Sequence, residues 1–217
     1  GGGPRWRKYF GPRHVMEAEY LLHWMTMADL ILAADEAMLR RECRGIVLGA
    51  DGVVARPLHK FFEPHQIGHG GSEFGWEAAG TVAEATEKLD GSMVYVVPMA
   101  EGGLELWSKS GPTAISKAAT RFAMEGGPDG RSDYMALISQ FEEVGHTATF
   151  EWMGKQVQVR VPVTDPRLVL TQARSKTTGE YMPYEQRAAL AAQCKVEVVT
   201  RYRELEGSCW YKRGQID

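Results

Sequence analysis

Short apolar runs alternate with glycine-containing turns over much of the chain, and this spacing is typical of β-hairpins. One such turn is Asp51-Gly52, a dipeptide that commonly joins two paired strands. A second is Glu101-Gly102-Gly103, again with apolar residues on both sides. The two predicted hairpins pair residues 45–48 with 52–55 and residues 93–97 with 104–107.

The remaining apolar patterns predict helices and further strands. Residues 15–42 are rich in Leu, Met, Ala and Glu, which favours a helix at least over 29–41, whereas 20–25 is equally compatible with a strand. Two later segments have the apolar spacing of amphipathic helices, and shorter apolar runs follow them. The later predicted helices are 113–125, 132–144 and 184–193, and the predicted strands are 148–152, 157–161 and 168–171.

This succession of elements also predicts the fold class. Many short strands joined by turns, with a few helices between them, are typical of an α+β fold built on antiparallel sheet. The 217 residues are enough for one ordinary domain with its own core, and no linker-like segment divides them. We therefore expect a single domain over 1–217.

Composition narrows the class of protein. Hydrophobic residues make up 44% of the chain and charged residues 24%, which is ordinary for a globular protein and excludes a disordered one. No apolar run approaches the roughly 20 residues that cross a bilayer, and the chain starts without a secretory signal, so we expect a cytoplasmic protein with no membrane partner. A net charge of −3 argues against a general nucleic-acid coat protein but leaves room for a local basic cleft.

A lysine followed by an Asp-Gly turn, Lys88-Leu89-Asp90-Gly91, is the first candidate for chemistry. The pattern alone is weak, because a hairpin turn explains it equally well. A lysine attacks as a nucleophile only in its neutral form, which neighbouring cations favour. On that hypothesis Lys88 is a nucleophile, and Gly91 lets the backbone pass close to a bound nucleotide.

Charged side chains elsewhere suit a site for a polyphosphate and a divalent metal, because cations bind phosphate oxygens and carboxylates bind ribose hydroxyls or a metal. Glu151 lies between Phe150 and Trp152, so the alternation of a strand points its side chain away from both aromatic rings. The candidate cations are Arg56, Lys60, Lys88 and Lys109, and the candidate carboxylates are Glu151 and Glu206.

These residues belong to a series of sequence blocks that follow one another between residues 42 and 208. The blocks are Glu42-Cys43-Arg44-Gly45-Ile46, Arg56-Pro57 with Lys60-Phe61-Phe62, Lys88-Leu89-Asp90-Gly91-Ser92, Ser108-Lys109, Phe150-Glu151, Thr178-Gly179-Glu180-Tyr181 and Glu206-Gly207. In this order they resemble the bacteriophage type 1 RNA ligase family of covalent nucleotidyltransferases, whereas residues 1–41 match it poorly. The resemblance implies an α+β nucleotidyltransferase (ATP-grasp-like ligase) fold over 42–217, in which antiparallel sheets flanked by helices enclose a nucleotide cleft.

The resemblance also implies a reaction and a role for each residue. Lys88 would attack the α-phosphorus of ATP, expel pyrophosphate and carry AMP, which then passes to an RNA 5′-phosphate before a 3′-hydroxyl displaces it. Magnesium or manganese would offset the charge at the phosphorus. Asp90 and Gly91 would shape the nucleophile loop, and Glu87 would bind adenine through its backbone. Arg56 and Lys60 would contact phosphates, and Lys109 would support the nucleotide. Glu151 would contact the ribose, and Glu206 would hold the metal.

Three alternatives for the activity remain open. The first is an ATP-dependent RNA ligase for the repair of RNA such as broken tRNA, acting in the host cytoplasm if a phage encodes it. The second is a catalytically silent nucleotide- or RNA-binding domain. The family places a lysine pair shortly after the Glu-Gly block, and the 217 residues end at Asp217 before such a pair, so we expect weak self-adenylylation of this chain. The third is a DNA ligase or a capping enzyme, which the lysine motif alone also permits.

Overall fold

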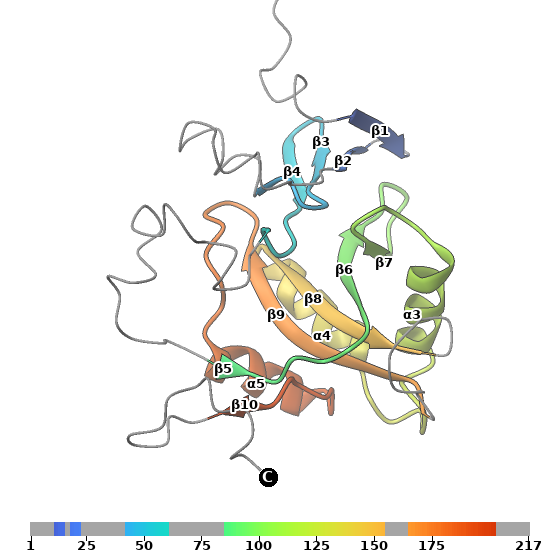
Figure 1. Ribbon diagram of the computed structural model, residues 1–217, viewed down its shortest axis with the longest axis vertical. Helices are drawn as coiled ribbons and strands as arrows, with labels where there is room; N and C mark the ends of the chain where they lie inside the picture. The colour runs from blue at the N-terminus through green and yellow to red at the C-terminus, as the bar shows by residue number, and fades with distance from the viewer. Residues whose placement is uncertain (1–10, 16–17, 23–41, 61–84, 155–164, 203–217) are drawn as a thin grey trace, which may run out of the picture.

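The computed structural model describes five stretches of the chain, and within them the strands form three antiparallel sheets with helices packed against one of them (Figure 1). The two stretches nearest the N-terminus are described for their backbone alone. The described residues are 11–15, 18–22, 42–60, 85–154 and 165–202.

The central sheet contains β6 (Ser92–Pro98), β7 (Leu104–Ser108), β8 (His146–Met153) and β9 (Arg167–Ser175). Its strand order is β7-β6-β8-β9, and every neighbouring pair is antiparallel. The pairing of β8 with β9 shifts register once, because Thr149 faces Gln172 while Phe150 faces Leu170. Thr171 is therefore an extra residue in β9, as in a β-bulge.

A second sheet has the order β1-β2-β3-β4 and packs through β4 against β6. A third consists of two short strands that are far apart in the sequence and pair with each other. The strands of the second sheet are β1 (Gly11–Val15), β2 (Ala18–Leu22), β3 (Val47–Gly49) and β4 (Gly52–Ala55), and those of the third are β5 (Ala85–Thr86) and β10 (Arg201–Tyr202).

Three described helices, α3 (Ala114–Met124), α4 (Tyr134–Glu143) and α5 (Tyr184–Gln193), accompany the central sheet. A capping box begins α3, in which Thr113 accepts from the backbone of Ser116 and Ser116 accepts from the backbone of Thr113. The length and apolar character that a bilayer span requires are not found together in any helix of the described stretches.

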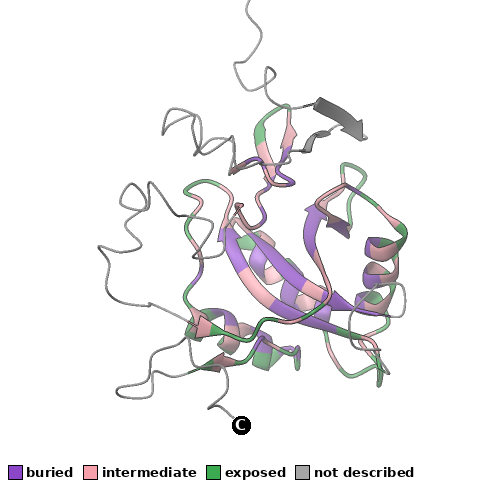
Figure 2. Cartoon of the chain, in the orientation of Figure 1, coloured by how far each residue is buried: buried purple, intermediate pink, exposed green. Residues whose placement is uncertain are grey.

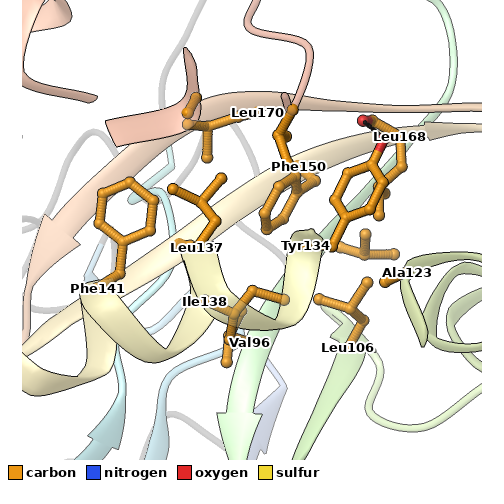
Figure 3. Close-up of a cluster of buried hydrophobic side chains, with 14 of the residues drawn as sticks. Val96, Leu106, Ala123, Tyr134, Leu137, Ile138, Phe141, Phe150, Leu168 and Leu170 are labelled. Carbon is orange, nitrogen blue, oxygen red and sulfur yellow. Dashed lines mark hydrogen bonds between the residues drawn. The ribbon is translucent and has the colours of Figure 1, made fainter. Parts of the chain in front are cut away.

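The main core fills the space between the central sheet and the helices (Figure 3). The ring of Tyr134 on α4 lies 6.3 Å from the ring of Phe150 on β8, and its hydroxyl donates to the carbonyl of Leu168 on β9 at 3.0 Å. The opposite face of β6 packs against a second cluster that includes Val47 and Ala55. Because apolar residues cover both of its faces, β6 is buried along most of its length (Figure 2).

Most of the predicted local elements are confirmed. Both hairpins form, as β3–β4 and β6–β7, and the three later helices lie where they were predicted. Of the two interpretations of 20–25, the strand is confirmed as far as Leu22. The predicted helix over 29–41 and the predicted strand over 157–161 lie outside the described residues. The α+β class built on antiparallel sheet is confirmed.

Candidate active site

The segment 87–91 connects β5 to β6, two strands that belong to different sheets. At its start, the backbone N–H of Glu87 donates to the carbonyl of Thr200 at 2.8 Å. Near its middle, Leu89 packs against an apolar cluster around Met153. The hairpin-turn alternative for this segment is therefore wrong, because the strands on its two sides do not pair and the segment crosses from one sheet to another.

Gly91 holds the end of this segment tightly against β8. A Cβ atom at position 91 would lie 2.5 Å from the carbonyl oxygen of Trp152 and 3.0 Å from the side chain of Met153. Real side chains do not approach backbone so closely, so only glycine fits here. The segment with Lys88 thus ends against the last residues of β8.

A pocket of about 470 Å³ opens beside the segment. Lys88 lines it and is at the same time exposed to solvent. The central sheet contributes side chains from β6, β8 and β9, and the chain before β3 and after β4 contributes Arg44 and Leu58. The others come from β5, from the segment 87–91 and from the chain before β10. The lining residues are Arg44, Leu58, Thr86, Glu87, Lys88, Leu89, Gly91, Met93, Glu151, Thr171 and Val199.

Glu151 lies on the face of β8 that its place between two aromatic residues predicted. Phe150 and Trp152 belong to the core beneath the helices, whereas Glu151 lines the pocket on the other face of the sheet. The strand alternation therefore places an ionisable group at the pocket while its two neighbours anchor the strand in the core.

The protonation of Glu151 responds to this environment. Burial raises the pKa of its carboxyl to about 7, and the negative charge of Asp90 adds to the shift. A hydrogen bond from the backbone of Gly91 and the positive charges of Lys88 and Arg44 act in the opposite direction. The group therefore changes its charge near neutral pH, as few carboxyl groups do.

Two cations, Arg44 and Lys60, act electrostatically on a third, Lys109. Burial lowers the pKa of Lys109, and the charges of Arg44 and Lys60 lower it further. Burial also lowers the pKa of Arg44, while the negative charge of Glu151 opposes that shift. Arg44 thus interacts both with the pocket carboxyl and with Lys109, and these cations provide positive charge in a partly dehydrated place.

Arg56 is engaged elsewhere. Its guanidinium pairs with the carboxylate of Glu42, with Nε and Nη2 at 2.9 and 2.8 Å from Oε2. Its Nη1 donates to the carbonyl of Thr177 at 3.2 Å. Burial raises the pKa of Glu42, but the hydrogen bonds and charges of Arg174 and Arg56 outweigh this and hold the pKa below its usual value.

The structure thus brings most of the predicted site residues together. Lys88, Glu87, Gly91 and Glu151 line one pocket, and Asp90 acts electrostatically on Glu151. Lys60 and Arg44 both act electrostatically on Lys109. Arg56 is outside the lining and bonded to Glu42, and Glu206 lies outside the described residues.

Arg44 and Thr171 are among the lining residues that were not singled out from the sequence. Arg44 stands inside the Glu-Cys-Arg-Gly-Ile block, and that block was the available signal for it. Thr171 is the extra residue of the β9 bulge, and its hydroxyl donates to the carbonyl of Thr149 at 3.0 Å. No local pattern marks Thr171, because the bulge exists only through the pairing of β9 with β8.

The donors for a metal are incomplete in this part of the protein. Within the described residues, no group of three or more His, Cys, Asp or Glu side chains is arranged to hold a metal ion. Because Glu206 lies outside those residues, the predicted magnesium or manganese site stays a prediction.

Comparison with known sequences adds independent information. A family model described as RNA ligase matches residues 42–207, which is most of the chain. A protein of Thermovibrio ammonificans named "Putative RNA ligase" is 30% identical over 149 residues, a stretch that makes up 66% of this chain and 36% of that protein.

Solved structures agree with the sequence comparison. An archaeal ATP-dependent RNA ligase (form 1) is 17% identical, with a TM-score of 0.58 over 91% of this chain and 48% of that chain. A mutant of the Naegleria gruberi RNA ligase with ATP and Mn is 19% identical, with a TM-score of 0.43 over 58% of this chain and 38% of that chain. The chain therefore spans less than half the length of these relatives. The archaeal likeness confirms the predicted nucleotidyltransferase fold, and the match over residues 42–207 shows that this chain belongs to the bacteriophage type 1 RNA ligase family.

Proposed function

We propose that this chain is the nucleotidyltransferase domain of an ATP-dependent RNA ligase, and that Lys88 is the residue that becomes adenylylated. One observation carries the proposal: Lys88 and Glu151 line the same pocket, and Gly91 seats the lysine segment on the strand that carries Glu151. The volume, about 470 Å³, lies within the range of small-molecule and cofactor sites.

The residues present fit a nucleoside triphosphate. The apolar side chains of Leu58, Met93 and Val199 offer a surface for a base, and Arg44 offers a guanidinium for phosphate oxygens. The carboxyl of Glu151, which titrates near neutral pH, is suited to bond with ribose hydroxyls in either protonation state. This mixture of apolar and polar groups is what a nucleotide needs for orientation.

In the proposed first step, the neutral amine of Lys88 attacks the α-phosphorus of ATP. A nitrogen–phosphorus bond forms as the bond to the bridging oxygen breaks, pyrophosphate leaves with the electron pair, and the amine loses a proton to solvent. Arg44, Lys60 and Lys109 would neutralise the phosphate charge, and the seat at Gly91 would hold the lysine against the pocket. No step is assigned to a metal, since the described residues do not assemble its ligands.

In the two later steps, AMP passes to the 5′-phosphate of an RNA and a 3′-hydroxyl then displaces it, which seals the strand. Broken or nicked RNA is the substrate class that the family implies, and repair of tRNA or other RNA in the cytoplasm is the proposed setting. The proposal further takes residues 1–217 to form a single domain. The other two alternatives differ from this proposal in what they predict for labelling and for substrate.

The test is mass spectrometry of the intact protein after incubation with ATP and a divalent cation. We expect the mass of one AMP to be added at Lys88, even if only a small fraction reacts, and to be absent in Lys88→Ala. Lys117→Ala is the matched control, because Lys117 is an exposed lysine on α3 that does not line the pocket. Labelling that persists in Lys88→Ala would overturn the assignment.

The adduct assay with ATP or GTP, together with ATP-binding and strand-sealing assays, separates the alternatives. A catalytically silent domain would bind ATP without forming an adduct, a capping-type enzyme would form its adduct with GTP, and a DNA ligase would seal nicked DNA in preference to RNA. Adduct formation with ATP followed by sealing of 5′-phosphate and 3′-hydroxyl RNA ends is the result that supports the proposal.

A further inference from the structure

One carboxylate joins three segments that are far apart in the sequence. Oε2 of Glu42 pairs with the guanidinium of Arg56, and Oε1 accepts from Nη2 of Arg174 at 2.6 Å. The side chain of Arg174 is only 5% exposed, and those of Arg56 and Glu42 are 18% and 22% exposed. The two arginines therefore share one partly dehydrated anion, an arrangement that is costly to disrupt from one side.

Arg174 extends the connection to two backbone segments. Its Nε donates to the carbonyl of Gly179 at 2.6 Å, and its Nη1 donates to the carbonyl of Pro57 at 3.2 Å. Its guanidinium also lies 4.9 Å from the centre of the Tyr181 ring. A single planar side chain thus ties the segment after β4 to the turn that follows β9.

The backbone at Gly179 lies directly against the guanidinium of Arg56. A Cβ atom at this position would lie 2.6 Å from Cζ of Arg56, and the backbone there has a φ of +79°, which glycine adopts without strain. The guanidinium of Arg56 is therefore packed against the 176–179 turn as well as paired with Glu42.

The segments that contain Glu42 and Arg56 continue into residues that line the pocket. Arg44 follows Glu42 by two residues, and Leu58 follows Arg56 by two residues; both line the pocket. The hydroxyl of Tyr181 accepts from the backbone N–H of His59 at 3.2 Å, which holds the chain next to Leu58. Neither Glu42 nor Arg174 lines the pocket, so any effect they have on a ligand passes through these neighbours.

We infer that Glu42 and Arg174 are positioning residues, which hold the wall formed by Arg44 and Leu58 in the geometry that binds the nucleotide. The inference rests on the proposed function, because it assigns these residues to the same pocket. On this inference Arg56 also helps to hold the wall through its ion pair with Glu42, a role separate from the phosphate contact predicted for it.

The experiment compares ATP binding and thermal unfolding in three forms of the chain. Isothermal titration calorimetry with ATP in the presence of EDTA gives a dissociation constant without catalysis, and thermal denaturation reports folding. We expect Glu42→Gln to remain folded and to bind ATP at least tenfold more weakly than the wild type, because the neutral amide cannot hold two guanidinium groups.

The matched control is Glu142→Gln. Glu142 pairs with Lys176, both side chains are 18% exposed, and Lys176 lies in the same turn that Arg56 contacts, but the pair has no bond to Glu42. We expect this variant to bind ATP as the wild type does, even if its melting temperature falls. Where Glu42→Gln fails to fold, Arg174→Lys takes its place, because lysine keeps the charge but cannot bond to Glu42, Pro57 and Gly179 at once.

The outcomes are distinguishable. If wild-type chain binds ATP and the folded Glu42→Gln and Arg174→Lys variants bind it equally well, the inference is overturned while the proposed function stands. Equal weakening by Glu42→Gln and Glu142→Gln would also overturn it, since the effect would then be one of general stability. A wild-type chain that binds no ATP would overturn the proposed function, and the inference with it.

Discussion

The contact between Gly91 and β8 permits a test in which one methyl group is added. In Gly91→Ala the new Cβ would lie 2.5 Å from the carbonyl oxygen of Trp152. This is roughly 1 Å inside the separation at which non-bonded heavy atoms settle, about 3.5 Å. Either β8 or the segment 87–91 must therefore move.

The surrounding bonds indicate which of the two moves. β8 is hydrogen-bonded to β6 on one side and to β9 on the other, so the strand is held along its length. The segment 87–91 has fewer anchors, and we expect it to shift by roughly 1 Å and to take Lys88 with it. Overpacking of this kind costs about 1–3 kcal/mol of folding free energy. A displacement of about 1 Å at a reacting group can cost a factor on the order of 100 in rate.

Two measurements check the prediction. Thermal denaturation should show a lower melting temperature for Gly91→Ala, and time-resolved mass spectrometry should show a much slower appearance of the AMP adduct relative to the wild-type chain. Gly49→Ala is the matched control, because its Cβ would meet only a methyl group of Val54, at 2.8 Å, which a side chain can move to relieve. The control should form the adduct at the wild-type rate.

The reasoning would be refuted if Gly91→Ala had the melting temperature and the labelling rate of the wild-type chain. That result would mean that the close approach to Trp152 does not determine where Lys88 lies. A loss of stability with an unchanged labelling rate would show that β8, and not the lysine segment, had moved.

Two further predictions concern stability alone. The pKa of Glu151 is raised from its ordinary value of 4.5 to about 7 in the folded protein, so the native state loses stability as pH rises through this interval. Glu151→Gln should therefore be more stable than the wild type at pH 8, by on the order of 2 kcal/mol. The difference in stability should shrink towards pH 5 when the two proteins are compared by thermal melts. An equal difference at both pH values would contradict the shift. Thr113→Ala removes the capping box of α3 and should lower the free energy of unfolding by about 1 kcal/mol in denaturant titrations, without changing adduct formation at Lys88; an unchanged midpoint would show that the cap contributes nothing.

Local elements were predictable where the signal is local. The turn residues Asp51-Gly52 and Gly102-Gly103 marked both hairpins, and apolar spacing predicted α3 and α4 to within two residues at each end. Such turn signals and apolar spacings depend on conformational preferences within a few residues, which the sequence displays directly. The strand over 18–22 was one of two interpretations, because its composition suits a helix as well.

The candidate site was predictable in part. The order of the blocks indicated Lys88 and Glu151, and strand alternation indicated the face of β8 on which Glu151 lies. The commitment of Arg56 to Glu42 was not predictable, because an ion pair across different segments leaves no mark on the local pattern. The contribution of Thr171 was hidden for a similar reason, since it depends on a register shift between two strands.

The amino-acid sequence alone therefore determined which segments become strands and helices, which faces of them are apolar, and which charged residues are available for chemistry. Tertiary structure decided which of those charges meet and how much water they lose. The near-neutral pKa of Glu151 is the clearest case: burial by segments distant in sequence raises it, and Arg44 and Lys88 oppose the shift. Desolvation and charge interaction depend on distance in space, and only the folded chain sets that distance.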